Sequence, residues 1–294
     1  MRIANVDNRS AVVIGEPGAE RAVDLAKISG GLFGPDPAAV YSVWSEITTW
    51  VAEQDNAAML DNSFAIDRAL LGAPSPKPRQ VFAVGLNYHA HAAESGFESP
   101  TTLPPVFTKY ASSFTGPETE VILPSGGNVD WEVELVAIIG RDASDISEND
   151  AWNYVAGLTA GQDISERITQ TRGPAPQFGL GKSYPGFSPQ GPWLVTPDEL
   201  ADKDDLRLGC AIDDTTVQDG RTRDLIFSVP RLIAALSRNV TLYPGDVIFT
   251  GTPAGVGVGR NPQRFLRAGE TLVSWIDGIG ELRQRFVDAP SVRS

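Results

Sequence analysis

The chain has 294 residues, and its 41% hydrophobic and 21% charged residues are typical of a globular protein with a substantial core. A formal net charge of −13 disfavours nucleic acid as a partner, because lysine and arginine drive binding to phosphate backbones. One cysteine and two histidines exclude a zinc site of thiolates and imidazoles, so any metal would be held by oxygen atoms. The lone cysteine and the lack of a signal-peptide pattern or a long apolar run predict a cytoplasmic protein that contacts no membrane.

The N-terminal residues predict a small α/β domain. Two β-like runs, 2–6 and 11–14, flank a polar turn, and apolar residues recur at helical spacing from Val40 to Val51. Residues 71–78 contain three prolines and predict a stiff extended linker. We therefore expect a small domain over 1–73 and a catalytic domain over 74–294.

The remainder of the chain predicts many short strands and few helices. The clearest helix runs from Ser228 to Leu236, with Ser228 as its N-cap. This pattern favours a mainly β or α+β fold over an alternating βαβ sheet. The β-like runs are 80–85, 106–109, 121–123, 131–140, 191–195, 206–212, 246–250 and 271–276.

Three carboxylates alternate along one predicted strand, at Asp130, Glu132 and Glu134. Alternate side chains of a strand share a face, so these like charges would crowd together unless a cation offsets them. Trp131 and Val133 would point to the other face. An edge strand with a solvated acidic face is the alternative.

Two further segments carry polar side chains at helical spacing. If Asp163 opens a helical turn, Arg167 and Gln170 follow on the same face, although a surface ion pair would give the same pattern. His91 and Glu94 are three residues apart, so on a helix Glu94 could orient the imidazole as a base; an ordinary surface pair is the alternative.

A glycine-rich segment, 244–257, predicts a short strand followed by a turn. Its backbone N–H groups and the hydroxyl of Thr252 could face a ligand. It lacks the glycine spacing of a dinucleotide-binding loop.

These motifs together resemble the fumarylacetoacetate hydrolase family, over roughly residues 80–287. The resemblance is carried by VGLNYHAHAAESG (84–96), VDWEVELVAIIG (129–140), GQDISERITQ (161–170), GKS (181–183) and PGDVIFTGTPAGVG (244–257). It implies the family's mixed β-roll for the catalytic domain. Two positions depart from the family pattern: Ile168 replaces a second acid, which puts substrate identity in doubt, and His89 replaces a smaller residue.

The resemblance also implies a role for individual residues. The metal ligands for Mg²⁺ or Mn²⁺ would be Glu132, Glu134 and Asp163, with Asp130 not a ligand. The catalytic residues would be His91, Glu94 and Lys182, with the His–Glu pair on a mobile lid. The substrate-binding residues would be Arg167, Gln170 and Thr252.

The function implied is a hydrolase that cleaves a C–C bond in a short β-diketo acid, such as an acylpyruvate or fumarylpyruvate, through a metal-bound enolate. A small anionic keto acid would be the substrate, and the family implies a homodimer. The alternatives are decarboxylation of a β-keto acid such as oxaloacetate, and isomerisation or hydration of an aromatic ring-cleavage intermediate. A metal-stabilised protein without turnover is the alternative outside enzymes.

Overall fold

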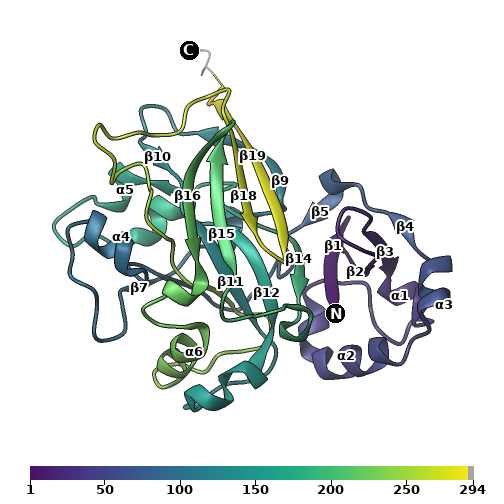
Figure 1. Ribbon diagram of the computed structural model, residues 1–294. Coiled ribbons are helices and arrows are strands. Elements are labelled where there is room, and N and C mark those ends of the chain that lie inside the picture. Colours follow the sequence, from purple (N-terminus) through teal and green to yellow (C-terminus); the bar gives the residue numbers. More distant parts are fainter. Residues whose placement is uncertain (291–294) are drawn as a thin grey trace.

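The computed structural model describes residues 1–290 and consists of a small N-terminal part beside a larger β-rich part (Figure 1). A 12-stranded mixed sheet runs through both parts. Its strands are β1 (Arg2–Val6), β2 (Arg9–Ile14), β3 (Arg21–Asp24), β4 (Phe64–Ala65), β5 (Leu71–Gly72), β6 (Val81–Val84), β7 (Val106–Phe107), β8 (Phe114–Thr115), β11 (Val133–Ile139), β12 (Val155–Gln162), β14 (Ser188–Val195) and β17 (Val247–Phe249).

Two smaller sheets complete the β structure. A 5-stranded sheet faces the large one, and a 2-stranded ribbon lies near the carboxylate motifs. The five strands are β9 (Glu118–Leu123), β15 (Arg207–Ile212), β16 (Thr215–Arg221), β18 (Thr271–Ile276) and β19 (Gly280–Asp288), and the ribbon is β10 (Val129–Asp130) with β13 (Ser165–Glu166).

Helices are short. The predicted helix at 228–236 is confirmed as α6, and the Ser228 side chain accepts a hydrogen bond from the Arg231 N–H at its start. The predicted stripe at 40–51 forms a 3₁₀ turn, Ala39–Val43, followed by α2. The α-helices are α1 (Leu25–Ile28), α2 (Trp44–Ala52), α3 (Asn56–Asp61), α4 (His89–Glu94), α5 (Arg167–Gln170) and α6 (Val229–Ser237).

The N-terminal part is joined to the rest by backbone pairing. Strand β1 pairs antiparallel with β14, with Arg2 opposite Val195. The proline-rich segment also packs closely, because the Tyr41 hydroxyl donates to the Pro74 carbonyl and the Ser75 hydroxyl to the Gly245 carbonyl. The boundary at residue 73 stays a prediction about separate folding units.

The alternation predicted for residues 130–139 is confirmed, although the strand is interrupted. Trp131 and Val133 lie in the core between the large and 5-stranded sheets, whereas Val136 and Ile138 pack in the other core beside α2. Pairing breaks between β10 and β11, so that Glu132 lies at the entrance to β11 rather than inside a strand.

The predicted mainly β or α+β class is confirmed by these sheets and by the modest helix content. Within the described residues, no helix has the length and apolarity needed to cross a membrane.

Candidate active site

Two adjacent strand ends bring the three predicted ligand carboxylates together. Glu134 lies opposite Gly161 in the β11–β12 ladder, and the Asp163 N–H donates to the Glu132 carbonyl at 2.9 Å. One carboxylate oxygen from each of Glu132, Glu134 and Asp163 lies within 4.8 Å of the others, and all three side chains are buried. The solvated acidic face considered as an alternative is therefore excluded.

Side-chain amides satisfy the backbone where the strand is interrupted. The Glu132 N–H donates to Gln162 Oε1 at 2.9 Å, and the Val133 N–H donates to Gln218 Oε1 at 3.0 Å. These bonds replace the ladder bonds that a continuous strand would make, since a buried N–H without an acceptor is unfavourable.

Asp163 does not open a helical turn, so that prediction is wrong. It follows β12, and the next residues form β13 and then α5, which begins at Arg167. Arg167 contacts different carboxylates instead: Nη2 lies 2.8 Å from Asp130 Oδ2 and 2.7 Å from Glu132 Oε1. Its Nη1 donates to Gln170 Oε1 at 2.9 Å, so the predicted pairing of Arg167 with Gln170 is present.

Two buried lysines complete the charge cluster. Lys182 Nζ lies 2.7 Å from Glu132 Oε2 and 2.6 Å from Asp163 Oδ2. Lys109 Nζ, which the sequence did not single out, donates to Asp163 Oδ1 and to the Lys182 carbonyl. The cluster contains four carboxylates and three cationic groups: Asp130, Glu132, Glu134, Asp163, Lys109, Arg167 and Lys182.

The pKa values of the triad carboxylates shift in opposite directions at Glu132 and Glu134. Burial alone would raise the pKa of Glu132, but Lys182 and Arg167 outweigh it and hold that pKa well below its usual range. Burial and the charges of Asp163 and Glu132 raise the pKa of Glu134 well above its usual value. The negative charge around Glu134 is therefore not fully compensated by the protein's own cations.

A divalent metal ion fits this donor set. Three buried carboxylates offer only oxygen ligands, as Mg²⁺ and Mn²⁺ prefer, and two extra positive charges would relieve the repulsion at Glu134. The residues that could hold the ion are Glu132, Glu134 and Asp163.

His91 and Glu94 form the pair that their spacing predicts. His91 Nδ1 lies 2.8 Å from Glu94 Oε1 on α4, and His91 is buried to 7% exposure. It is therefore not an ordinary surface pair. His89, on the same helix, is exposed and contacts Ser99 instead.

The glycine-rich segment binds the chain's own carboxylates. The Gly251 N–H donates to Glu134 at 2.7 Å, the Gly255 N–H to Glu94 at 2.9 Å, and the Gly257 N–H to Asp130 at 2.7 Å. The prediction that these N–H groups face a ligand is wrong at these three positions, because each already has an acceptor within the protein.

Thr252 is not brought to the cavity wall. Its hydroxyl donates to the Val133 carbonyl at 2.9 Å and accepts from Gln218 Nε2 at 2.8 Å. The side chain holds the glycine-rich segment against β11, and direct substrate contact by Thr252 stays a prediction.

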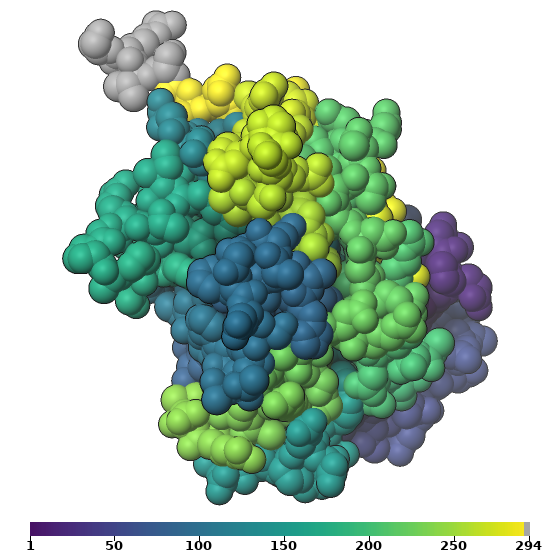
Figure 2. All heavy atoms as spheres, turned by 60° about the vertical axis from the view of Figure 1, so that its left-hand side comes forward, coloured from purple at the N-terminus to yellow at the C-terminus, as the bar shows by residue number. Residues whose placement is uncertain are grey.

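A cavity of about 610 Å³ adjoins the charge cluster. Its wall includes His91, Glu132, Arg167, Gln170 and Lys182, so five of the predicted site residues face one space. Figure 2 shows the α4 segment, in dark blue, at the surface beneath the segment near residue 260 and beside the teal segment that carries α5.

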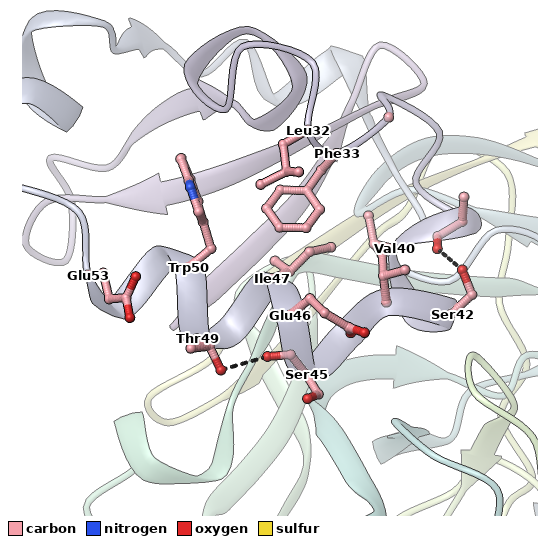
Figure 3. A pocket seen from close by; sticks show the side chains of 13 residues that line it. Leu32, Phe33, Val40, Ser42, Ser45, Glu46, Ile47, Thr49, Trp50 and Glu53 are labelled. Atoms are coloured by element: carbon pink, nitrogen blue, oxygen red, sulfur yellow. Dashed lines mark hydrogen bonds between the residues drawn. The ribbon is translucent and has the colours of Figure 1, made fainter.

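A second cavity, of about 750 Å³, lies along α2 in the N-terminal part (Figure 3). Leu32, Phe33 and Trp50 surround it, and the hydroxyls of Ser42 and Thr49 already donate to backbone carbonyls. It contains no member of the charge cluster, so the chemistry belongs to the smaller cavity.

Sequence reasoning missed Lys109, Gln162 and Gln218. The signal at Lys109 was a charged residue ending the apolar run Val106-Phe107, which is unusual unless that charge is paired. The two glutamines carried no signal, because their partners, among them the backbone N–H groups of Glu132 and Val133, lie far away in the sequence.

Comparisons with known proteins show the family to which the chain is related. Residues 80–287 match the family described as Fumarylacetoacetate (FAA) hydrolase C-terminal. A 2,4-didehydro-3-deoxy-L-rhamnonate hydrolase from Sphingomonas sp. (strain SKA58) is 43% identical over 216 residues, which cover 73% of this chain and 75% of that protein. The human mitochondrial oxaloacetate tautomerase FAHD2A is also 43% identical over 216 residues, covering 73% of this chain and 68% of that protein.

Solved structures extend the likeness to the whole fold. A Mycobacterium smegmatis protein that carries the name HpcE superposes with a TM-score of 0.90 at 53% identity, covering 99% of this chain and 100% of that one. Maleylpyruvate hydrolase from Sphingobium sp. SYK-6, in complex with manganese (II) ion and pyruvate, gives 0.79 at 30% identity, covering 99% and 100%. The chain belongs to the fumarylacetoacetate hydrolase family.

Proposed function

We propose that the chain is a Mg²⁺- or Mn²⁺-dependent hydrolase that cleaves a C–C bond in a short β-diketo acid of the acylpyruvate or fumarylpyruvate type. The observation that carries this proposal is that His91, oriented by Glu94, and the triad member Glu132 line the same cavity. Hydrolysis of a carbonyl compound needs a positioned base beside a group that stabilises negative charge. The pyruvate bound to the maleylpyruvate hydrolase is the product that acylpyruvate cleavage would release.

Glu132, Glu134 and Asp163 would hold the metal ion, which when bound supplies a Lewis acid for the substrate's carboxylate and 2-oxo oxygens. Arg167 and Gln170 line the cavity next to Glu132 and would keep the substrate in register. Lys182 contacts both Glu132 and Asp163, so its ammonium group would stabilise negative charge as it develops on the substrate.

His91 acts as the general base. With the Nδ1–H donated to Glu94, Nε2 is left to accept a proton from water. The hydroxide attacks the distal carbonyl carbon, and the bond from that carbon to the methylene carbon breaks. The electron pair leaves with the pyruvate fragment as an enolate, which takes a proton to give pyruvate. The other product is a carboxylic acid, so one water is consumed for each bond cleaved.

The test is release of pyruvate by the purified protein with Mn²⁺ from acetylpyruvate and from fumarylpyruvate, measured with coupled lactate dehydrogenase. His91→Ala should lower kcat by about 10²–10⁴-fold, the usual contribution of a general base. His89→Ala is the matched control, since His89 lies on the same helix but is exposed and outside the cavity lining. Release of no pyruvate from these two substrates and from a longer-chain acylpyruvate would refute the proposal.

A second candidate is keto–enol tautomerisation of a 2-oxo acid such as oxaloacetate. It is favoured by the human tautomerase, whose identity to this chain equals that of the hydrolase relative. His91 would then move a proton between carbon and oxygen without activating water. Loss of the enol absorbance of oxaloacetate without pyruvate would support this reaction, whereas pyruvate formed from oxaloacetate would indicate the decarboxylation that the family also allows.

A further inference from the structure

The cavity has a charged inner end, where Glu132 and Lys182 are buried, and an apolar end at its mouth, where Phe97 and Ile168 are 60% and 48% exposed. Glu132, Arg167 and Lys182 lie at the charged end, together with His91. Most of the remaining wall is hydrophobic and comes from the segments around α4 and α5, from β7, and from residues 258–265, which follow the glycine-rich segment. Its large apolar side chains are Leu86, Phe97, Phe107, Ile168, Phe178 and Phe265.

The described residues of the wall offer no free cation at the apolar end. Arg167 is engaged with Asp130 and Glu132, and Lys182 with Glu132 and Asp163. The other polar wall residues, such as Asn128 and Gln263, are neutral. A carboxylate placed at this end would lose water without gaining a charged partner, which is unfavourable.

The net charge of the cluster also disfavours a second carboxylate on the substrate. The four carboxylates and three cationic groups of the cluster leave one net negative charge, with each group in its usual charged form. A bound divalent cation would turn this into one net positive charge. Glu94, which contacts His91, adds a further negative charge beside the cavity, so a second substrate carboxylate would not be compensated.

Ile168, which stands where the family pattern has a second acid, places an apolar side chain on the cavity wall. It follows Arg167 on α5, lines the cavity, and is 48% exposed. Phe97, which follows α4, also lines the cavity and is 60% exposed. Large apolar side chains left in water at the mouth of a cavity are typical of a surface that an apolar ligand covers.

We propose that the preferred substrate is a 3-acylpyruvate with a neutral, apolar acyl group, such as a medium-chain alkanoyl group, rather than a dicarboxylate such as fumarylpyruvate. The inference rests on the proposed hydrolase function and specifies its substrate class. The pyruvoyl end contacts the charge cluster, and the acyl group lies against Ile168 and Phe97. A volume of about 610 Å³ leaves room for an acyl group longer than acetyl.

The first experiment compares kcat/KM for hexanoylpyruvate, acetylpyruvate and fumarylpyruvate with the Mn²⁺-loaded protein. Hexanoylpyruvate should exceed fumarylpyruvate by at least about tenfold, and should also exceed acetylpyruvate because more CH₂ groups are buried. A kcat/KM for fumarylpyruvate equal to or above that for hexanoylpyruvate would overturn the substrate class while leaving the hydrolase function intact. Absence of pyruvate from all three would reject the hydrolase function itself.

The second experiment uses Ile168→Arg, which adds a cation at the apolar end. The ratio of kcat/KM for hexanoylpyruvate to that for fumarylpyruvate should fall by about tenfold or more, the scale of one added charge-assisted hydrogen bond. Ile122→Arg is the matched control, because Ile122 is 50% exposed on β9 and does not line the cavity. An unchanged ratio in a folded Ile168→Arg protein, with Tm within a few degrees of wild type, would overturn the placement of the acyl group.

Discussion

The backbone N–H of Gly255 donates a hydrogen bond to Glu94, with 2.9 Å to Oε2, while Glu94 Oε1 lies 2.8 Å from His91 Nδ1. Gly255 has φ of +110°, and a Cβ atom built there would lie 2.2 Å from the Val217 carbonyl oxygen. Only a glycine lets the loop pass this close to β16 and still aim its N–H at α4. The glycine-rich segment thus orients His91, the proposed general base, through Glu94.

Gly255→Ala should therefore impair catalysis. The clash with Val217 would move the N–H away from Glu94 and loosen the His91 ring, so we expect kcat to fall by about tenfold or more. Steady-state kinetics with acetylpyruvate measures this. Gly30→Ala is the control, since Gly30 also has positive φ, +61°, but a Cβ there meets nothing within 4 Å. Equal losses in both variants would mean that backbone strain alone explains the effect.

Metal binding should release a proton. Burial, Asp163 and Glu132 raise the pKa of Glu134, so its carboxyl group holds a proton in the metal-free protein at a pH below that raised pKa. A metal ligand must be deprotonated, so metal affinity should increase as pH rises toward that pKa and level off above it. Calorimetric titration with Mn²⁺ in two buffers of different ionisation enthalpy measures the released proton.

The Glu134→Gln variant tests whether Glu134 is the group that releases the proton. The amide cannot release a proton and is a poorer ligand, so Mn²⁺ affinity should fall by more than about a hundredfold. Glu120→Gln removes an exposed carboxylate and should leave affinity unchanged. Proton release that persists in Glu134→Gln would assign the titrating group elsewhere.

Features of the site that depend on neighbouring residues in the sequence could be predicted, whereas features that depend on distant residues could not. The alternation of Trp131 and Val133 with the carboxylates is a local property, and the structure confirms it. The strand β12 was not predicted, because it is buried on both faces and carries two glycines, so it lacks a period of two. Asp163 was consequently expected to open a helical turn, although the family motif still marked it as a predicted metal ligand.

The glycines of β12 show why contacts between distant strands could not be predicted from the local sequence. A Cβ on Gly161 would lie 2.5 Å from Val136 Cγ2 and 2.9 Å from a Phe249 ring carbon. These neighbours come from β11 and β17, and only the folded sheet reveals that they leave no room for a side chain. Strand propensity alone disfavours glycine at this position.

Lys109→Met should destabilise the metal-free protein. The Lys109 ammonium is buried and donates to Asp163 Oδ1 and to two backbone carbonyls, so its removal leaves a buried carboxylate with one cationic partner fewer. Breaking a buried pair typically costs about 3–5 kcal/mol. Urea denaturation of the metal-free protein measures this change. Lys203→Met, at a partly exposed lysine on the surface, is the control.

Mn²⁺ should recover part of the stability lost in Lys109→Met. The ion would supply positive charge next to Asp163, so the difference in Tm between variant and wild type should shrink at saturating Mn²⁺. A difference that does not change with Mn²⁺ would show that Lys109 stabilises the fold independently of the triad's charge.

Gln218 on β16 ties the 5-stranded sheet to the active-site strand. Its Nε2 donates to Thr252 Oγ1 at 2.8 Å and to the Pro253 carbonyl at 2.7 Å, and its Oε1 accepts from the Val133 N–H at 3.0 Å. Gln218→Leu keeps the bulk but leaves these buried groups without partners. Each unsatisfied group costs about 1–3 kcal/mol, so we expect a loss of roughly 2–5 kcal/mol in the free energy of unfolding.

Because Val133 lies between Glu132 and Glu134, Mn²⁺ affinity should fall as well. Urea denaturation and Mn²⁺ titration measure the two effects, with exposed Thr216→Ala on the same strand as the control. Loss of stability with unchanged Mn²⁺ affinity would show that the β11 entrance keeps its geometry without this amide.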